Sequence, residues 1–347
     1  MIVPFLIGTL AVLFMFQANY LIFLFKEFSI SAIPLTATLQ ILLYKSPEWL
    51  NMTLPIGTSL AAALAISRLT RESEITAMRS AGASIRRILM PVVGFGLLVA
   101  IGNFFMAEEV MPRARNSARS LFAQVALVGG APEFKSNVTL QLQNKVAIIG
   151  TVARGANNTI QLSSVLLYEK PNETTTMLVR AERGEYRDGN WTLPNYYVWI
   201  MEGESLVSAT SSTTPMVIRE PVTVESIFSP KEPEELSSDE LLRQIKDLKK
   251  QGFDTRAPEV QYHTRFSVPT SCIIFALVAP IFSVLFARSG AFVGVLLSLV
   301  VVLLYYNGFI ISTQILGRNG IVPPWLAAWL PNLVFAAFGV IATRWLE

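Results

Sequence analysis

Two reactive side chains are almost absent from this sequence, which has one cysteine and one histidine among 347 residues. A single cysteine, Cys272, excludes an intrachain disulfide, and its apolar surroundings predict a small buried thiol. With one histidine, His263, no metal site built from several His and Cys ligands can form, and we expect no cofactor. There is also no G-x-x-x-x-G-K-[ST] phosphate loop, so we expect neither ATP hydrolysis nor any other enzymatic activity from this chain.

Charge is also scarce. Only 15% of the residues are charged and 52% are hydrophobic, with a mean hydropathy of +0.47, whereas soluble domains carry about 25% charged residues. The apolar residues gather in 1–112 and 264–345, and the charge gathers between them. The net charge of +3 is weak support for nucleic-acid binding, because positive charge in membrane proteins more often sets topology. The composition therefore predicts a membrane protein with a polar insertion, and no nucleic-acid partner.

Six segments are long and apolar enough to cross a bilayer, since a span needs about 20 mostly apolar residues. The second is the least hydrophobic but is rich in small residues, which favour close packing against other helices. The six predicted spans cover residues 2–25, 47–69, 88–111, 266–286, 291–315 and 324–342.

The short loops predict the orientation of these spans. Residues 68–87 contain five arginines and two glutamates, whereas the link between the first two spans has two lysines and two glutamates. Because Lys and Arg favour the cytoplasm, we place 68–87 there. Both termini are then cytoplasmic, and residues 113–262 lie outside.

Residues 133–228 have the pattern of a β-domain. Alternating and β-branched runs, as at 138–143 and 196–201, are separated by turn-forming clusters such as 154–158 and 187–190. After them, Ser237 and Glu240 form a capping box for a helix over 238–251, which Gly252 ends. We therefore predict an α-helical polytopic membrane protein with six transmembrane helices and an inserted all-β, jelly-roll-like domain. Its parts are 1–112, 113–262 and 263–347.

The most specific feature is the link at 68–87. Residues 72–81 should form a short helix that ends at Gly82, after which Ser84 caps the next span. On that helix Ile75 and Met78 share one face. A short charged helix with an apolar anchor suits insertion into a groove of another protein, and the alternative is an ordinary solvated loop. The candidate contact residues are Arg71, Glu72, Glu74, Ile75, Met78 and Arg79.

Three stretches carry a family resemblance. Residues 69–82 resemble the coupling-helix signature of the LptF/LptG (YjgP/YjgQ) lipopolysaccharide export permeases. Residues 238–256, leading into 263–269, and residues 322–332 are similar to two further motifs of that family, in the same order. The likeness covers essentially the whole chain.

The resemblance implies a permease subunit of an ABC-type exporter in the bacterial inner membrane. Such a subunit extracts lipopolysaccharide from the outer leaflet and passes it to a periplasmic β-jelly-roll bridge. The implied partners are a cytoplasmic LptB-like ATPase dimer, a second LptF/LptG-type permease (a paralogue or a second copy), an LptC/LptA-like bridge and lipopolysaccharide itself.

The resemblance also assigns roles to individual residues. Glu74 matches the acidic residue that contacts the ATPase. Lys26, at the outer end of the first span, would meet the lipid phosphates, unless it is only a lysine that snorkels to the interface. Gly290 and Gly294 would allow close helix approach at a lateral gate between span five and the partner's first span.

Two other functions stay open at this point. One is a permease that transmits the force of ATP hydrolysis to the outside domain without moving lipid. The other is a structural or receptor protein that presents its β-domain outside the cell.

Overall fold

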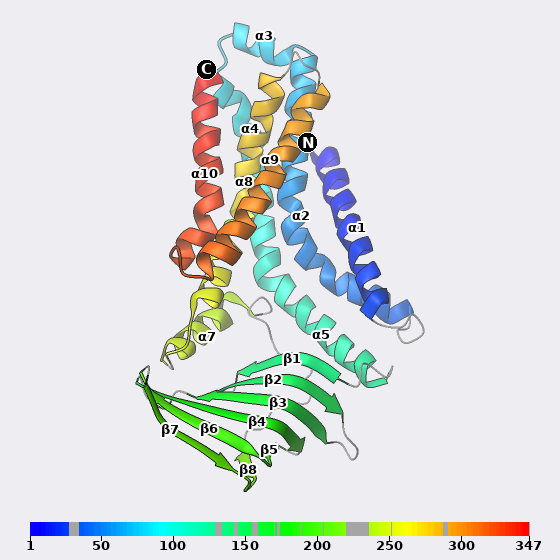
Figure 1. Cartoon of the computed structure of the whole chain (residues 1–347). Coiled ribbons are helices and arrows are strands. Elements are labelled where there is room, and N and C mark those ends of the chain that lie inside the picture. The colour runs from blue at the N-terminus through cyan, green and yellow to red at the C-terminus, as the bar shows by residue number, and fades with distance from the viewer. Residues whose placement is uncertain are drawn as a thin grey trace.

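The structure, a computed structural model, describes residues 1–27, 35–128, 134–141, 145–154, 159–169, 171, 174–187, 189–203, 205–219, 236–250, 252–286 and 291–346. A bundle of long helices stands at one end of the molecule and a curved β-sheet at the other (Figure 1). The short helix α3 (Glu74–Ser80) and the end of α10 lie at the end of the bundle farthest from the sheet.

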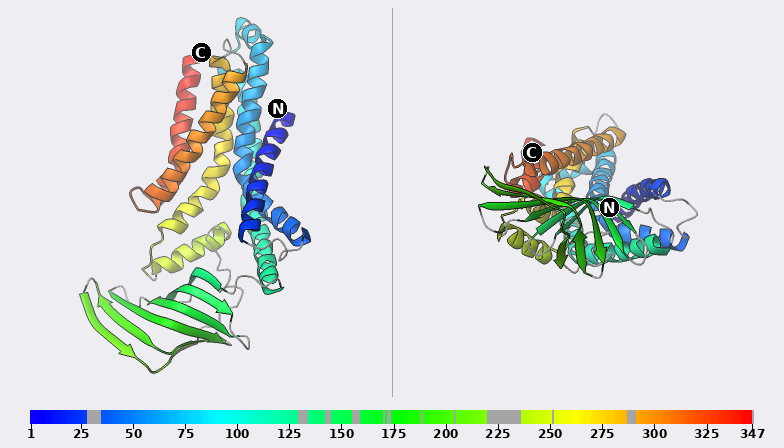
Figure 2. Two further views of the ribbon diagram at one scale, coloured as in Figure 1. Left: turned by 45° about the vertical axis from the view of Figure 1, so that its right-hand side comes forward. Right: turned by 60° about the horizontal axis from the view of Figure 1, so that its bottom comes forward.

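Within the described residues, six helices are long and apolar enough to cross a membrane, which confirms the six predicted spans. Their helical elements are α1 (Ile2–Glu27), α2 (Leu35–Arg71), α4 (Ile85–Phe105), α8 (Arg256–Leu285), α9 (Ala291–Ile310) and α10 (Pro324–Leu346). Two of them continue through π-helical turns: α4 through η1 (Met106–Val110) into α5 (Met111–Val128), and α9 into η4 (Ile311–Gly317). Helix α8 lies in the middle, in contact with α2, α4, α9 and α10. Helix α1 packs on α2 at the edge of the bundle (Figure 2).

Small side chains let these helices approach closely. Ala61, Ala62 and Ala63 of α2 are fully buried, as the small-residue composition of the second span predicts. Gly96 of α4 lies against α8, where an added Cβ would be 2.5 Å from the Cβ of Ala276. Such close contacts favour helix association in a membrane. Lipid tails are as apolar as the side chains, so the hydrophobic effect does not hold the helices together and packing must do so.

Buried polar side chains also join the helices. The Tyr305 hydroxyl of α9 donates to the side-chain oxygen of Asn332 in α10, at 2.6 Å. The Asn332 amide donates in turn to the backbone oxygen of Ser267 in α8, at 2.7 Å. On the other side of α8, Asn103 of α4 donates to the backbone oxygen of Asn51 in α2, at 3.0 Å. These hydrogen bonds satisfy polar groups that lipid could not.

The helices extend beyond the predicted spans. Helix α2 begins at Leu35 rather than near residue 47, and α8 begins at Arg256 rather than near 266. The helix that follows α4 continues to Val128, past the predicted start of the outer domain at 113. Each extension contains several polar or charged residues, which lower its hydropathy below that of the neighbouring span. Tertiary contacts of α5 with α2 hold the last of them in place.

The strands form one antiparallel sheet. They are β1 (Phe134–Gln141), β2 (Lys145–Arg154), β3 (Ile160–Glu169), β4 (Thr175–Arg187), β5 (Asn190–Leu193), β6 (Tyr196–Glu202), β7 (Ser205–Ser212) and β8 (Met216–Arg219). The order is β1-β2-β3-β4-β5-β8, and β6 pairs with β4 and β7. Alternate residues, among them Ile149, Val165 and the fully buried Trp191, form the core of this domain. The predicted β-domain is thus confirmed, although residues 220–228 and several shorter stretches of the prediction, among them 155–158 of one turn cluster, lie outside the described residues.

Helix α7 (Ser238–Lys250) follows the strands and begins with the predicted capping box. The Ser237 amide donates to the Glu240 carboxylate at 2.9 Å, and the Glu240 amide donates to the Ser237 hydroxyl at 3.3 Å. At the other end Gly252 has a positive φ of 68°, the conformation that ends helices and favours glycine.

Candidate functional site

The segment that links α2 to α4 has a defined backbone. Helix α2 ends at Arg71, and Ser73 adopts a left-handed conformation (φ 60°) that separates it from α3. Gly82 (φ 86°) follows α3, and the Ala83 amide donates to the Met78 carbonyl at 2.9 Å. The Ser84 hydroxyl then accepts a hydrogen bond from the Arg87 amide and caps α4. The predicted helix, glycine stop and serine cap are therefore all present, and the helix begins at Glu74 rather than residue 72.

Apolar side chains attach α3 to the bundle. Ile75 is only 4% exposed and packs in a cluster with residues of α2, α4 and α8, and Met78 packs beside it. This differs from the expectation that Ile75 inserts into a partner, because its side chain is already covered within the chain. A displacement of α3 would therefore move the ends of α2 and α4 with it.

Charged side chains cover the exposed part of the segment. Arg71, Glu72, Glu74 and Arg79 are exposed. Arg79 donates to the backbone oxygen of Leu346 at 3.2 Å, which ties α3 to the end of α10. The guanidinium of Arg68 donates to the Glu72 carboxylate at 2.9 Å.

The hydrogen bond from Arg68 holds the pKa of Glu72 below its usual range. Because the pKa of Glu72 is lowered in the folded chain, its pair with Arg68 stabilises the segment at pH values above the ordinary pKa of a glutamate. That stabilisation is lost as the pH falls through the lowered pKa. We expect Arg68→Gln to return the pKa of Glu72 to its usual range, measured by carbon-13 NMR titration of the glutamate carboxyls. Arg79→Gln is the matched control, since its guanidinium bonds to Leu346 instead; an equal shift in both variants would contradict the assignment.

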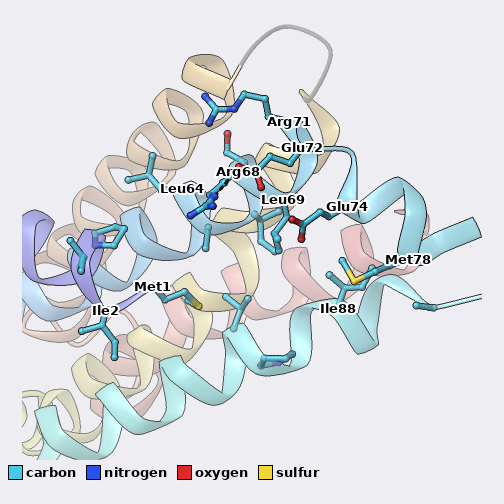
Figure 3. A pocket seen from close by; sticks show the side chains of 18 of the residues that line it. Met1, Ile2, Leu64, Arg68, Leu69, Arg71, Glu72, Glu74, Met78 and Ile88 are labelled. Atoms are coloured by element: carbon cyan, nitrogen blue, oxygen red, sulfur yellow. Dashed lines mark hydrogen bonds and ion pairs between the residues drawn. The ribbon is translucent and has the colours of Figure 1, made fainter. Parts of the chain in front are cut away.

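A cavity of about 1160 Å³ opens beside this segment. It lies between the first residues of α1, the last two turns of α2, the start of α4, and Glu74 and Met78 of α3. Figure 3 shows Met1 and Ile2 on one side, Leu64 and Leu69 along α2, and Met78 and Ile88 on the other. The segment therefore forms one wall of an open space at the end of the bundle.

The chain matches the family described as Lipopolysaccharide export system permease LptF/LptG over residues 1–345, essentially its whole length. This chain belongs to the LptF/LptG family. A search of curated proteins returns no match. The resemblance found in the sequence is thus confirmed, and membership identifies a multi-pass inner-membrane transport subunit of the lipopolysaccharide export system.

The other residues that the LptF/LptG resemblance singles out lie elsewhere. Lys26 falls in the last turn of α1, a helix that runs from the N-terminus away from α3 (Figure 1), and its side chain is outside the described part of the chain. Gly290 is also outside the described residues. Gly294 of α9 faces α8, where an added Cβ would be 2.8 Å from the Cα of Ser283. The close approach at Gly294 is therefore found within one permease, and its role at a lateral gate stays a prediction.

A buried ionic cluster near the β-domain was missed by sequence reasoning. Arg265 of α8 is 3% exposed and lies 3.8 Å from the carboxylate of Glu108 in η1. Glu108 also accepts hydrogen bonds from the hydroxyl and the amide of Ser238, at 2.6 and 3.1 Å. The cluster thus joins η1, α8 and the start of α7. The position of Arg265 at the start of an apolar span predicts that it has a partner, because a charged side chain in a membrane helix needs one. The sequence does not show that the partner is Glu108.

A second ion pair of this LptF/LptG permease links α5 to α2. Arg115, almost fully buried, donates to the Glu48 carboxylate at 3.1 Å, and Lys45 approaches the same carboxylate at 3.1 Å. The pair fixes the polar helix α5 beside the start of α2. Helices α5 and α7, which these clusters join to the bundle, lie at its end nearest the sheet (Figure 1).

Proposed function

We propose that this chain is one of two permease subunits of an ATP-driven lipopolysaccharide exporter, and that residues 68–87 couple it to a cytoplasmic ATPase dimer. The observation that carries the proposal is the attachment of α3. Its apolar side packs into the bundle through Ile75, while its charged side faces outward at the end of the molecule. A push on α3 by a closing ATPase reaches α2 and α4 directly.

The charges of the segment suit a partner of mixed charge. Glu74 lies in the first turn of α3, where the helix dipole stabilises a carboxylate, and Arg71 and Arg79 flank it. Charged contacts of this kind set the register and specificity of docking more than its total affinity. Glu74 is the contact we expect to carry most of the specificity, with Arg71, Glu72, Arg79 and the partly buried Met78 around it.

The proposed orientation and lipid path follow from the LptF/LptG family and from the positions of α3 and the sheet at opposite ends of the molecule. With 68–87 in the cytoplasm, both termini are cytoplasmic and the sheet stands in the periplasm. ATP binding would then squeeze an intramembrane space between the two permeases, with Lys26 near the lipid phosphates and Gly294 near the gate. The apolar interior of the β-domain would receive the acyl chains. It would pass them to a periplasmic bridge that is itself a β-jelly roll.

The test is charge reversal at the coupling contact. We expect Glu74→Arg to weaken association with the soluble ATPase at least about tenfold, the size of a lost charge-assisted contact, and to stop export. Association is measured by copurification and export by lipopolysaccharide transfer from proteoliposomes. Glu109→Arg is the matched control, since it makes the same change at an exposed position toward the other end of the bundle.

Two results would overturn parts of this proposal. Normal association and export in the Glu74 variant would remove the coupling role. A permease that stimulates the ATPase normally, yet never crosslinks to photoactivatable lipopolysaccharide, would transmit force without moving lipid.

A further inference from the structure

The first third of α2 does not follow the axis of the bundle. Helix α2 has 37 residues and would measure about 55 Å if it were straight, at 1.5 Å per residue, whereas the apolar core of a bilayer is only about 30 Å thick. Pro47 lies within the helix, and a proline removes one backbone hydrogen bond and bends a helix. Figures 1 and 2 show that α2 bends away from the bundle at the end nearest the sheet. Residues 35–46 therefore do not extend straight out of the membrane.

One face of this segment is apolar and has no cover within the described part of the chain. Leu35, Leu39 and Leu43 are 74%, 58% and 67% exposed, and their spacing of four residues places them in one row along the helix. The opposite face packs on the protein, with Ala37 and Ile41 buried. A row of exposed leucines marks a contact with lipid or with another molecule.

The level of the membrane surface is marked at the end of this segment. Lys45 and Glu48 form an ion pair at 3.1 Å, and Arg115 donates to the same carboxylate. Charged groups are costly in the bilayer core. Beside them, the rings of Tyr20 in α1 and Trp49 in α2 are in contact, with centroids 5.2 Å apart, and Tyr and Trp are enriched where the core meets the headgroups. The row of leucines therefore begins at the membrane surface.

The row is continuous with a surface that faces lipid. Ile22 and Phe23, in the last turns of the span formed by α1, are 55% and 51% exposed, and α1 packs on α2. Residues 35–44 contain no charged side chain. Aromatic residues and arginine usually anchor protein interfaces, and the row contains neither. Lipid is therefore a better occupant of this face than a protein.

We propose that residues 35–46 form an interfacial helix, which binds the lipid surface of the leaflet nearest the sheet. Leu35, Leu39 and Leu43 insert among the upper parts of the acyl chains, as the apolar face of an amphipathic surface helix does. Because α2 also contacts α5, this interfacial helix holds α5 at a fixed height relative to the bilayer. Only the identification of the leaflet as the outer one rests on the proposed orientation.

The test measures the depth of the leucine positions in a bilayer. The full-length permease, without ATPase or lipopolysaccharide, is placed in nanodiscs of phosphatidylcholine and phosphatidylglycerol. Leu35→Cys, Leu39→Cys and Leu43→Cys are labelled one at a time with a nitroxide, while the native Cys272 is fully buried and stays unlabelled. Collision rates with oxygen, which enters the acyl chains, and with a nickel chelate, which stays in water, give the depth. We expect about 5–10 Å below the headgroups at all three positions.

Two positions of α1 provide the matched control. Phe14 and Ile22 are 63% and 55% exposed and have the same spacing in the chain as Leu35 and Leu43. Labels at Phe14→Cys and Ile22→Cys should differ in depth by about 10 Å, because a spanning helix rises 1.5 Å per residue. Labels at the two leucine positions should differ by less than half of that. Val217→Cys, at a 55% exposed position of the sheet, gives the value for water, and thermal unfolding shows that each variant is folded.

Three results would overturn the interfacial helix. Collision with the nickel chelate equal to that at Val217 would place the segment in water. A depth that changes as steeply between Leu35 and Leu43 as between Phe14 and Ile22 would make it a continuation of the span. Protection from both reagents, with dipolar broadening between labels on two chains, would assign the row to a second copy of the permease. None of these results bears on the Glu74 experiment, so the two proposals fail separately.

Discussion

Replacing Arg265 by glutamine is expected to destabilise the permease by about 3 kcal/mol, the lower end of the cost of removing one partner from a buried ion pair, because the Glu108 side chain is 25% exposed. Arg265 donates to the backbone oxygens of Leu236 and Ala107 and lies 3.8 Å from the Glu108 carboxylate. Without the guanidinium, Glu108 keeps its bonds to Ser238 but loses its buried cation. Because this cluster joins η1, α8 and α7, the loss should also loosen α7 from the bundle. The measurements are the thermal unfolding midpoint in detergent and the rate of proteolysis near residue 236.

Two companion variants separate burial from charge. Arg113→Gln breaks the Arg113–Glu109 pair, which is shorter, at 2.8 Å, but 80% and 58% exposed. An exposed pair of this kind contributes only about 0.5 kcal/mol, so this variant should unfold almost as the wild type does. The double variant Glu108→Gln with Arg265→Gln should be more stable than the single one, since no partly buried charge is left without its cation. If the Arg265 and Arg113 variants lost equal stability, the buried cluster would not hold the junction.

The sequence predicts the membrane helices well and their ends poorly, for one physical reason. A bilayer imposes a threshold of length and hydropathy that each span must meet by itself, so a local window detects it. Helix α5 contains three arginines and is too polar to be detected as a span in this way. It is held by Ala118 and by the ion pair between Arg115 and Glu48, residues that are 67 positions apart in the chain. Contacts between distant positions leave no local pattern, so the predicted boundary at 113 missed this helix.

The coupling segment, residues 68–87, could also be predicted only in part. Gly82 and Ser84 carry local signals for a helix end and a cap, and the structure has both. The spacing of Ile75 and Met78 correctly indicates an apolar face. It does not indicate whether that face packs on the same chain or on a partner, and here Ile75 is buried in a cluster with residues of α2, α4 and α8. The cavity had no sequence signal, because it forms between side chains of elements that are far apart in the chain.

Gly96→Leu is expected to cost about 3 kcal/mol and to lower the yield of folded permease severely. Overpacking of a close contact usually costs 1–3 kcal/mol, and this site belongs at the upper end because backbone atoms oppose the new side chain. A Cβ at Gly96 would be 2.9 Å from the carbonyl oxygen of Cys272 and 3.3 Å from the Cα of Ile273. Helix α8 cannot retreat easily, since its other sides contact α2, α9 and α10. Yield and unfolding midpoint are measured by fluorescence-detected size-exclusion chromatography of a tagged permease.

Gly94 provides a matched control in the same helix. An added Cβ there meets no atom within 4 Å, so Gly94→Leu makes the same chemical change where no helix is in contact. Replacing a helical glycine gains up to about 1 kcal/mol of helix propensity, and this variant should therefore be at least as stable as the wild type. Since propensity favours both substitutions equally, any difference between them measures the contact between α4 and α8 alone. A Gly96 variant as stable as the Gly94 variant would show that these helices are not packed as the structure places them.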